Sequence, residues 1–143
     1  MYTRIALGIL AVVLVSACIN PAYTPTVSFT IDRSEITIKN NQTSTDLVTV
    51  TITKEDNKNI PTNFVVKFSY PDGIYPVIND QKVSEYTTKT LQYQDSKDPV
   101  QFKVFGQVFG QQDSATYTMI IQLYYNNSFL EGKEQTLKVI VNR

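Results

Sequence analysis

The chain has 143 residues, with 13 basic and 13 acidic side chains, no histidine, no tryptophan and one cysteine. Without histidine or a second cysteine, it has no serine–histidine or cysteine–histidine nucleophile and no His or Cys cluster for a metal. The lysines are scattered singly, so no basic stripe is present to bind nucleic acid. We therefore expect a protein that is not an enzyme, needs no cofactor and has no nucleic-acid partner.

The first residues follow the order of a secretory signal peptide. One positive charge at Arg4 precedes the apolar run 5–15, and two small residues follow that run. Carried through to Ile19, the run reaches about fifteen residues, whereas a membrane-spanning helix needs roughly 20. We predict that residues 1–17 are a signal peptide, with an uncleaved signal anchor as the alternative. Removal of the signal would leave 12 basic and 13 acidic residues, a net charge of −1.

The segment Val15-Ser16-Ala17-Cys18 resembles the lipobox of prokaryotic lipoproteins, in which a leucine-like residue and two small residues precede the cysteine. The resemblance implies that Cys18 becomes a lipidated first residue, which would place the protein outside the cytoplasm on a cell membrane. Two or more acyl chains would give a stable anchor. An ordinary signal followed by a chance cysteine is the alternative, although a lone cysteine has no partner for a disulfide. Residues 18–26 contain two prolines and are predicted to form a short extended tether.

Apolar and polar residues alternate with a period of two over residues 27–143, which is typical of half-buried strands. The first predicted strand covers residues 27–31 and continues at 36–38 after a break at 32–35. The other predicted strands cover residues 47–53, 64–68, 87–91, 100–104, 117–123 and 137–141. Turns are predicted at 40–42, 71–73 and 126–127, where Asn, Pro, Asp and Gly gather. Residues 74–98 are the least regular part. Within it, Ile74, Tyr75, Val77 and Ile78 are expected to cover an open edge of the core. About seven strands in one domain favour a two-sheet Greek-key sandwich.

The segment from Asp113 to Met119 resembles the tyrosine corner of immunoglobulin-like domains. The resemblance implies that the Tyr117 hydroxyl forms a hydrogen bond to nearby backbone. It also implies that Met119 replaces a cysteine, that Val50 replaces its disulfide partner and that Phe64 replaces a core tryptophan. We therefore expect an all-β, immunoglobulin-like sandwich, similar to the modules of prokaryotic cell-surface and adhesion proteins.

Candidate binding residues lie in two aromatic turn segments. Tyrosine supplies a large contact area at low entropic cost, and asparagine adds hydrogen bonds. The alternative is that these tyrosines only pack at the rim of the core, and the sequence does not tell whether the two segments share one end of the domain. The candidates are Tyr70, Tyr75, Tyr124, Tyr125, Asn126 and Asn127.

Two further patterns concern modification and metal binding. Asn41-Gln42-Thr43 and Asn126-Asn127-Ser128 match the acceptor pattern for N-glycosylation, and both fall in predicted turns. The acidic segments 55–57 and 95–98 offer oxygen ligands for calcium. A lysine in or beside each segment opposes a cation, and neither has EF-hand spacing, so we expect no metal site.

The sequence thus predicts a membrane-tethered lipoprotein of the cell envelope that acts as a non-catalytic binding or structural module. Its expected partners are the membrane, through the lipid anchor, and another envelope protein or a glycan. Addition of a partner strand to an open sheet edge is one possible binding mode. The alternative function is a small inhibitor or accessory subunit of an exported enzyme.

Overall fold

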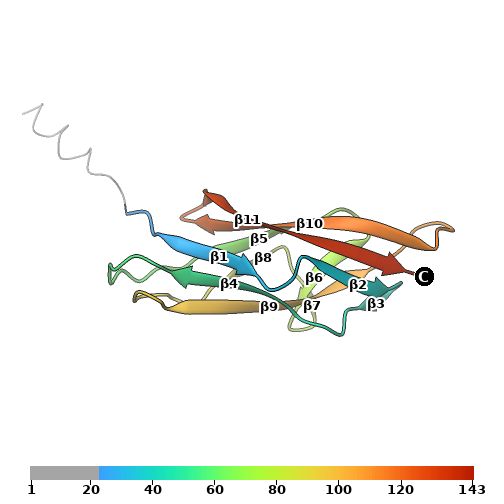
Figure 1. The fold of residues 1–143 in the computed structure, drawn as a ribbon, viewed down its shortest axis with the longest axis horizontal. Coiled ribbons are helices and arrows are strands. Elements are labelled where there is room, and N and C mark those ends of the chain that lie inside the picture. Colours follow the sequence, from blue (N-terminus) through green and yellow to red (C-terminus); the bar gives the residue numbers. More distant parts are fainter. Residues whose placement is uncertain (1–22) are drawn as a thin grey trace, which may run out of the picture.

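The computed structural model describes residues 23–143, so the predictions for the signal peptide and for Cys18 lie outside the described residues. Two β-sheets pack face to face in an elongated sandwich (Figure 1). The all-β, immunoglobulin-like fold is thereby confirmed. Between residues 23 and 143 there is no helix with the length and apolar character needed to cross a membrane.

The first sheet has the strand order β1-β4-β9-β6-β7, and β3 pairs with β9 beside this path. Its strands are β1 (Val27–Ile31), β3 (Gln42–Thr43), β4 (Val48–Lys54), β6 (Ile74–Ile78), β7 (Gln81–Lys82) and β9 (Lys97–Gly106). The second sheet has the order β2-β11-β10-β5-β8. Its strands are β2 (Glu35–Lys39), β5 (Val65–Ser69), β8 (Glu85–Thr87), β10 (Ser114–Tyr125) and β11 (Ser128–Asn142).

The core lies between the sheets, where alternate residues of the long strands point inward. In β4, for example, every second residue is buried. Val50, Phe64 and Met119 are completely buried at the positions that the resemblance assigned to a disulfide and a tryptophan. Phe68 and Phe102 meet edge to face across the core, with ring centroids 5.1 Å apart. Apolar packing therefore joins the two sheets here.

The structure has eleven strands rather than seven, partly because the first predicted strand is divided between the sheets. β1 pairs antiparallel with β4, whereas β2 pairs parallel with β11. The chain changes sheets at Asp32–Ser34, where the Asp32 carboxylate accepts a hydrogen bond from the Thr49 N–H at 2.9 Å. The polar residues 32–35 and a shift of the apolar positions from odd to even numbers mark this break in the sequence, but they do not show that the chain changes sheets there.

The irregular segment 74–98 contains the short strands β6, β7 and β8, and the strand predicted at 87–91 is wrong in its position. β8 ends at Thr87, and Leu91 forms only an isolated bridge with Thr62. The reason lies at Thr88, whose hydroxyl accepts a hydrogen bond from the Phe64 N–H at 3.0 Å. The Thr88 hydroxyl therefore replaces the backbone oxygen that would accept this hydrogen bond in a regular pair of strands.

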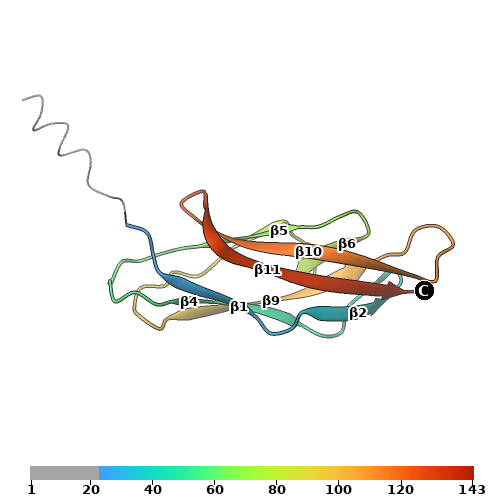
Figure 2. The same cartoon turned by 45° about the horizontal axis from the view of Figure 1, so that its top comes forward.

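The strand directions place the connections at two opposite ends of the sandwich (Figures 1 and 2). Tyr23, the β4–β5 and β8–β9 connections and the β10–β11 hairpin lie together, and we call this the Tyr23 end. The β2–β3 turn, the β5–β6 turn, the β9–β10 connection and the C-terminus lie at the far end. Any site built on these loops therefore belongs to one end or the other.

Candidate functional site

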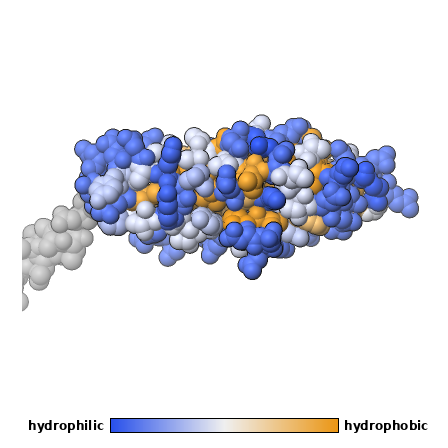
Figure 3. All heavy atoms as spheres, turned by 90° about the horizontal axis from the view of Figure 1, so that it is seen from below, coloured by the Kyte–Doolittle hydropathy of each residue, from blue (hydrophilic) through white to orange (hydrophobic). Residues whose placement is uncertain are grey.

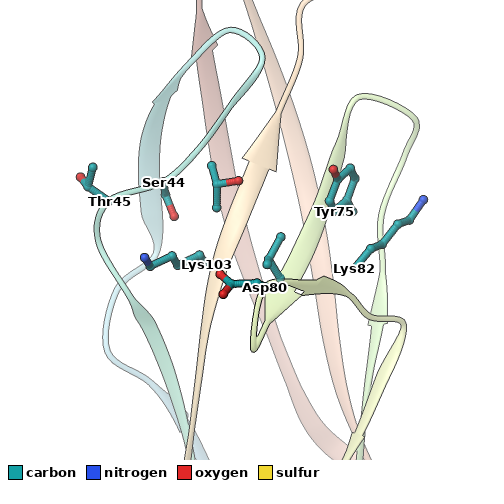
Figure 4. Close-up of a pocket in the computed structure, with 8 residues that line it drawn as sticks. Ser44, Thr45, Tyr75, Asp80, Lys82 and Lys103 are labelled. Carbon is teal, nitrogen blue, oxygen red and sulfur yellow. The ribbon is translucent and has the colours of Figure 1, made fainter.

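An open groove of about 350 Å³ crosses the outer face of the first sheet, and we call it the sheet groove. Side chains reach it from the segment 43–45, from β6 and β9, and from the β6–β7 turn. Figure 4 shows the Lys103 side chain lying between Thr45 and Asp80. The groove therefore combines hydroxyl, aromatic, ammonium and carboxylate groups. Its lining residues are Thr43, Ser44, Thr45, Tyr75, Val77, Asp80, Lys82 and Lys103.

Tyr75 forms the aromatic wall of the sheet groove. Its ring stacks on Phe105, directly opposite on β9, with centroids 4.7 Å apart and an interplanar angle of 16°. The Lys82 ammonium lies 5.0 Å from the centroid of Tyr75 and 5.9 Å from that of Tyr70. A cation at these distances is attracted to an aromatic face. These contacts fix the position of Tyr75 without a ligand.

A second hollow of about 210 Å³ adjoins the sheet groove. It shares Val77, Asp80 and Lys103 with the groove and adds Ile78 and Leu47, whose exposed fraction is 41%. Seen from below, hydrophobic residues gather near the middle of the molecule (Figure 3). The two hollows together make one surface that mixes apolar and charged groups.

The candidate tyrosines do not form one site. Tyr70 and Tyr75 lie on either side of the β5–β6 turn, toward the far end. Tyr124 and Tyr125 adjoin the β10–β11 hairpin at the Tyr23 end. Among the six candidate binding residues, only Tyr75 lines the sheet groove. The opposite directions of the strands separate the two aromatic segments, a point that the sequence left open.

Tyr124 and Tyr125 make different contacts. Tyr125 packs against Phe64 and Tyr23, with ring centroids 6.0 Å and 6.3 Å away. Tyr124 packs beside Phe129, its partner across the hairpin, at 5.8 Å. Both rings are partly exposed, so they serve the packing of the hairpin and also contribute to the surface.

The two glycosylation patterns occur in tight turns with positive φ. Asn41 has a φ of 60° in the β2–β3 turn, and Asn126 and Asn127 have φ values of 50° and 64° in the β10–β11 turn. Asparagine tolerates this conformation better than most residues. All three side chains are exposed. The acceptor residues Asn41 and Asn126 therefore lie at opposite ends of the sandwich.

A buried charge cluster joins the N-terminal segment to the domain. Lys54 is completely buried, and its ammonium lies 2.5 Å from the Asp56 carboxylate and also donates to the backbone oxygen of Lys58. The Asp56 carboxylate accepts further hydrogen bonds from the Tyr23 hydroxyl at 2.7 Å and from the Thr26 N–H at 3.0 Å. The Lys58 N–H donates to it at 3.1 Å. Four hydrogen-bond donors thus contact the Asp56 carboxylate, which belongs to one of the two acidic segments considered above as calcium ligands.

The protonation states follow from these contacts. Burial acts to lower the pKa of Lys54, but hydrogen bonds with Asp56 and Tyr23 outweigh burial and raise this pKa. Burial acts to raise the pKa of Asp56, but hydrogen bonds from Lys54, Tyr23 and the backbone hold this pKa well below its usual range. Burial and the hydrogen bond to Asp56 raise the pKa of Tyr23. At neutral pH, Lys54 and Asp56 are therefore charged and Tyr23 is neutral.

Tyr117 connects three segments at the far end. Its hydroxyl donates to the carbonyl oxygen of Gln107 at 2.7 Å, and its ring lies over Gly73, where an added Cβ would be 2.6 Å from the ring. The Gln107 N–H in turn donates to the Gly73 oxygen at 2.7 Å. The Asp113 side chain is exposed, and its carbonyl oxygen accepts a hydrogen bond from the Arg143 N–H at 2.8 Å.

The described part of the chain, residues 23–143, brings no three His, Cys, Asp or Glu side chains together in a way that could hold a metal ion. In the second acidic segment, Asp98 is mostly buried and accepts a hydrogen bond from the Lys89 N–H at 2.9 Å.

The sequence does not reveal that Lys82, Lys103 and Asp80 are neighbours of Tyr75. They come from different strands and turns, so only the sheet pairing brings them together. A usable signal did exist for Lys54, because it continues the inward alternation of β4.

No protein-family model matches the chain, and no curated protein matches its sequence. Solved structures do resemble it. The CARDB domain of the PF1109 protein from Pyrococcus furiosus, in complex with di-metal ions, has a TM-score of 0.52 and 12% identity, covering 87% of this chain and 100% of that one. Native α2-macroglobulin of Escherichia coli has a TM-score of 0.54 and 11% identity over 81% of this chain, which spans only 6% of the macroglobulin's length. These likenesses show the fold alone.

Proposed function

We propose that this chain is a non-catalytic binding module, held on the outer surface of a cell membrane by acyl chains on Cys18. We further propose that it binds another envelope protein or a glycan through the sheet groove. The observation that carries the proposal is the convergence in one groove of a stacked tyrosine, two lysines and an aspartate. Such a set of groups suits recognition of a polar partner that also has apolar parts.

The groove chemistry favours binding over catalysis. Asp80 is its single carboxylate, whereas glycoside hydrolysis uses a pair. The whole chain also lacks histidine, the commonest general base. Lys82 and Lys103 outnumber Asp80, so the groove favours a partner with acidic groups.

Membrane attachment is tested by the variant Cys18→Ala. We expect this variant to appear in the medium or to accumulate as an unprocessed precursor, because it cannot receive the acyl chains that hold the mature protein. Cell fractionation followed by mass measurement checks the result. A variant that stays in the membrane fraction at the mature size contradicts lipidation.

The binding role is tested by placing a photo-crosslinking amino acid at Thr45, on the rim of the sheet groove. We expect a crosslinked envelope partner from this position in intact cells, and we expect Lys103→Glu to reduce its yield by reversing the charge beside it. Thr118 provides the matched control, since it is an exposed threonine on the outer face of the other sheet. Equal crosslinking from Thr45 and Thr118, or none from Thr45, contradicts a specific site. Capture of an exported enzyme would instead favour an inhibitor or accessory subunit.

A further inference from the structure

The Tyr23 end carries three large apolar side chains that remain exposed. They are Ile60, Tyr93 and Phe129, with exposed fractions of 37%, 59% and 39%. Ile60 lies in the connection between β4 and β5, Tyr93 lies in the connection between β8 and β9, and Phe129 lies at the start of β11, beside the β10–β11 turn. The two connections and the hairpin lie at the same end of the sandwich (Figures 1 and 2). Their exposed apolar groups therefore belong to that end.

Contacts between these segments join them into one surface. Thr62 and Leu91 exchange two backbone hydrogen bonds, at 3.0 Å and 2.8 Å, which holds the β4–β5 connection against the β8–β9 connection. Tyr23 links the hairpin to the β4–β5 connection, because its ring meets Tyr125 and its hydroxyl donates to Asp56. Tyr23, the first described residue, therefore lies between the hairpin and the β4–β5 connection.

The distance between this surface and a lipid anchor is short. Five residues along the chain lead from Cys18 to Tyr23, and such a segment spans at most about 17 Å even when fully extended. The hydrogen bonds of Asp56 with Tyr23 and Thr26 hold residues 23–26 on the domain, so these residues do not add to this reach. An acylated Cys18 would consequently hold the Tyr23 end close to the bilayer.

The chemistry of the surface suits the interface between lipid and water. Tyrosine and phenylalanine favour this region, where one side of a group is apolar and the other is wet. Exposed charges at this end balance, since Lys58, Lys89 and Lys97 stand against Glu55, Asp95 and Glu131. Apolar contact, rather than attraction to anionic headgroups, would therefore supply the binding.

We propose that the Tyr23 end rests on the lipid bilayer, with Ile60, Tyr93 and Phe129 in its interfacial region. This inference rests on the proposed membrane attachment and adds an orientation to it. The long axis of the sandwich then points away from the membrane, with the β5–β6 turn and the β9–β10 connection outermost. The sheet groove lies on the flank and remains open to partners.

The natural chain has no tryptophan, so a single introduced tryptophan reports on one position alone. The test compares Tyr93→Trp and Phe129→Trp in protein that is expressed from the whole chain, purified from cells in its mature form and mixed with phosphatidylcholine vesicles. Phe109→Trp is the matched control, because Phe109 is 52% exposed in the β9–β10 connection at the far end. All three positions are exposed, so each variant is expected to fold, which thermal unfolding verifies.

We expect tryptophan at positions 93 and 129 to emit at shorter wavelength and to be quenched by brominated acyl chains, whereas tryptophan at position 109 shows neither effect. Added phosphatidylglycerol should leave these signals unchanged. If all three variants float with the vesicles and emit alike, the bilayer contact is refuted while the anchor stands. If none floats, the anchor itself is refuted and the orientation with it. A wavelength shift found only in native envelopes would show a protein partner on this end and would also overturn the proposal.

Discussion

Replacing Asp56 by alanine is expected to lower the free energy of unfolding by about 3–5 kcal/mol, because it leaves the buried Lys54 ammonium without its counter-charge. The variant also removes the acceptor of the Tyr23 hydroxyl and of two backbone N–H groups. Urea unfolding at neutral pH measures the loss. Glu55→Ala provides the control, since its side chain is exposed and its removal should change stability by no more than about 0.5 kcal/mol.

A double variant separates the unpaired charge from the lost packing. Lys54→Met combined with Asp56→Ala removes both charges and keeps an apolar side chain at position 54, so it should be more stable than Asp56→Ala alone. A double variant that is no more stable than the single one would contradict the interpretation that the unpaired ammonium dominates the loss.

The pH dependence supplies an independent check. The pKa of Asp56 is lower in the folded than in the unfolded protein, so its contribution is fully present above the unfolded value of about 4 and is lost as the pH falls below it. The stability difference between the natural chain and Asp56→Ala should therefore be constant near neutral pH and shrink in acid. A difference that does not change with acidification would show that the ionised carboxylate is not responsible.

Replacing Gly73 by alanine is expected to destabilise the domain by about 2–5 kcal/mol. Gly73 has a φ of +111°, where a Cβ is strained, and the new methyl group would lie 2.6 Å from the Tyr117 ring. The conformational part amounts to about 1–2 kcal/mol, and forcing the ring aside adds about 1–3 kcal/mol. Thermal or urea unfolding gives the total.

Gly110→Ala is the matched control for this effect. Gly110 also has a positive φ, +69°, but an added Cβ there meets no atom within 4 Å. It should therefore show only the conformational part, about 1–2 kcal/mol. Tyr117→Phe removes the hydrogen bond to Gln107 and should lower stability by about 1 kcal/mol while keeping the ring over Gly73. Equal effects of Gly73→Ala and Gly110→Ala would mean that the ring contact contributes nothing.

The fold class was predictable because alternation of period two extends along almost the whole domain. Inward residues such as Val50, Phe64 and Met119 are buried as the pattern requires. The break in the first strand is visible in the sequence, but its division between the sheets was not predictable, because it depends on the pairing of β1 with β4 and of β2 with β11. The position of β8 was not predictable either, because the Thr88 hydroxyl competes with the backbone for Phe64.

The sheet groove was even less predictable from the sequence. Thr45, Tyr75 and Lys103 are distant along the chain and become neighbours only through the pairing of β3 and β6 with β9. A tyrosine in a turn is visible in a sequence, but the lysine that will lie over its ring is not. The Lys54 cluster was partly predictable, since a lysine that points into the core requires a buried acceptor.

The parallel pairing of β2 with β11 has a mechanical consequence. Five residue pairs join these strands, and β2 belongs to the same N-terminal segment as Tyr23, while β11 leads to the C-terminus at the opposite end. A pull applied between the N-terminus and the far end runs along both strands and across the hydrogen bonds between them. All of these bonds then carry the load together in shear, rather than opening one after another, and the sandwich resists extension along its long axis.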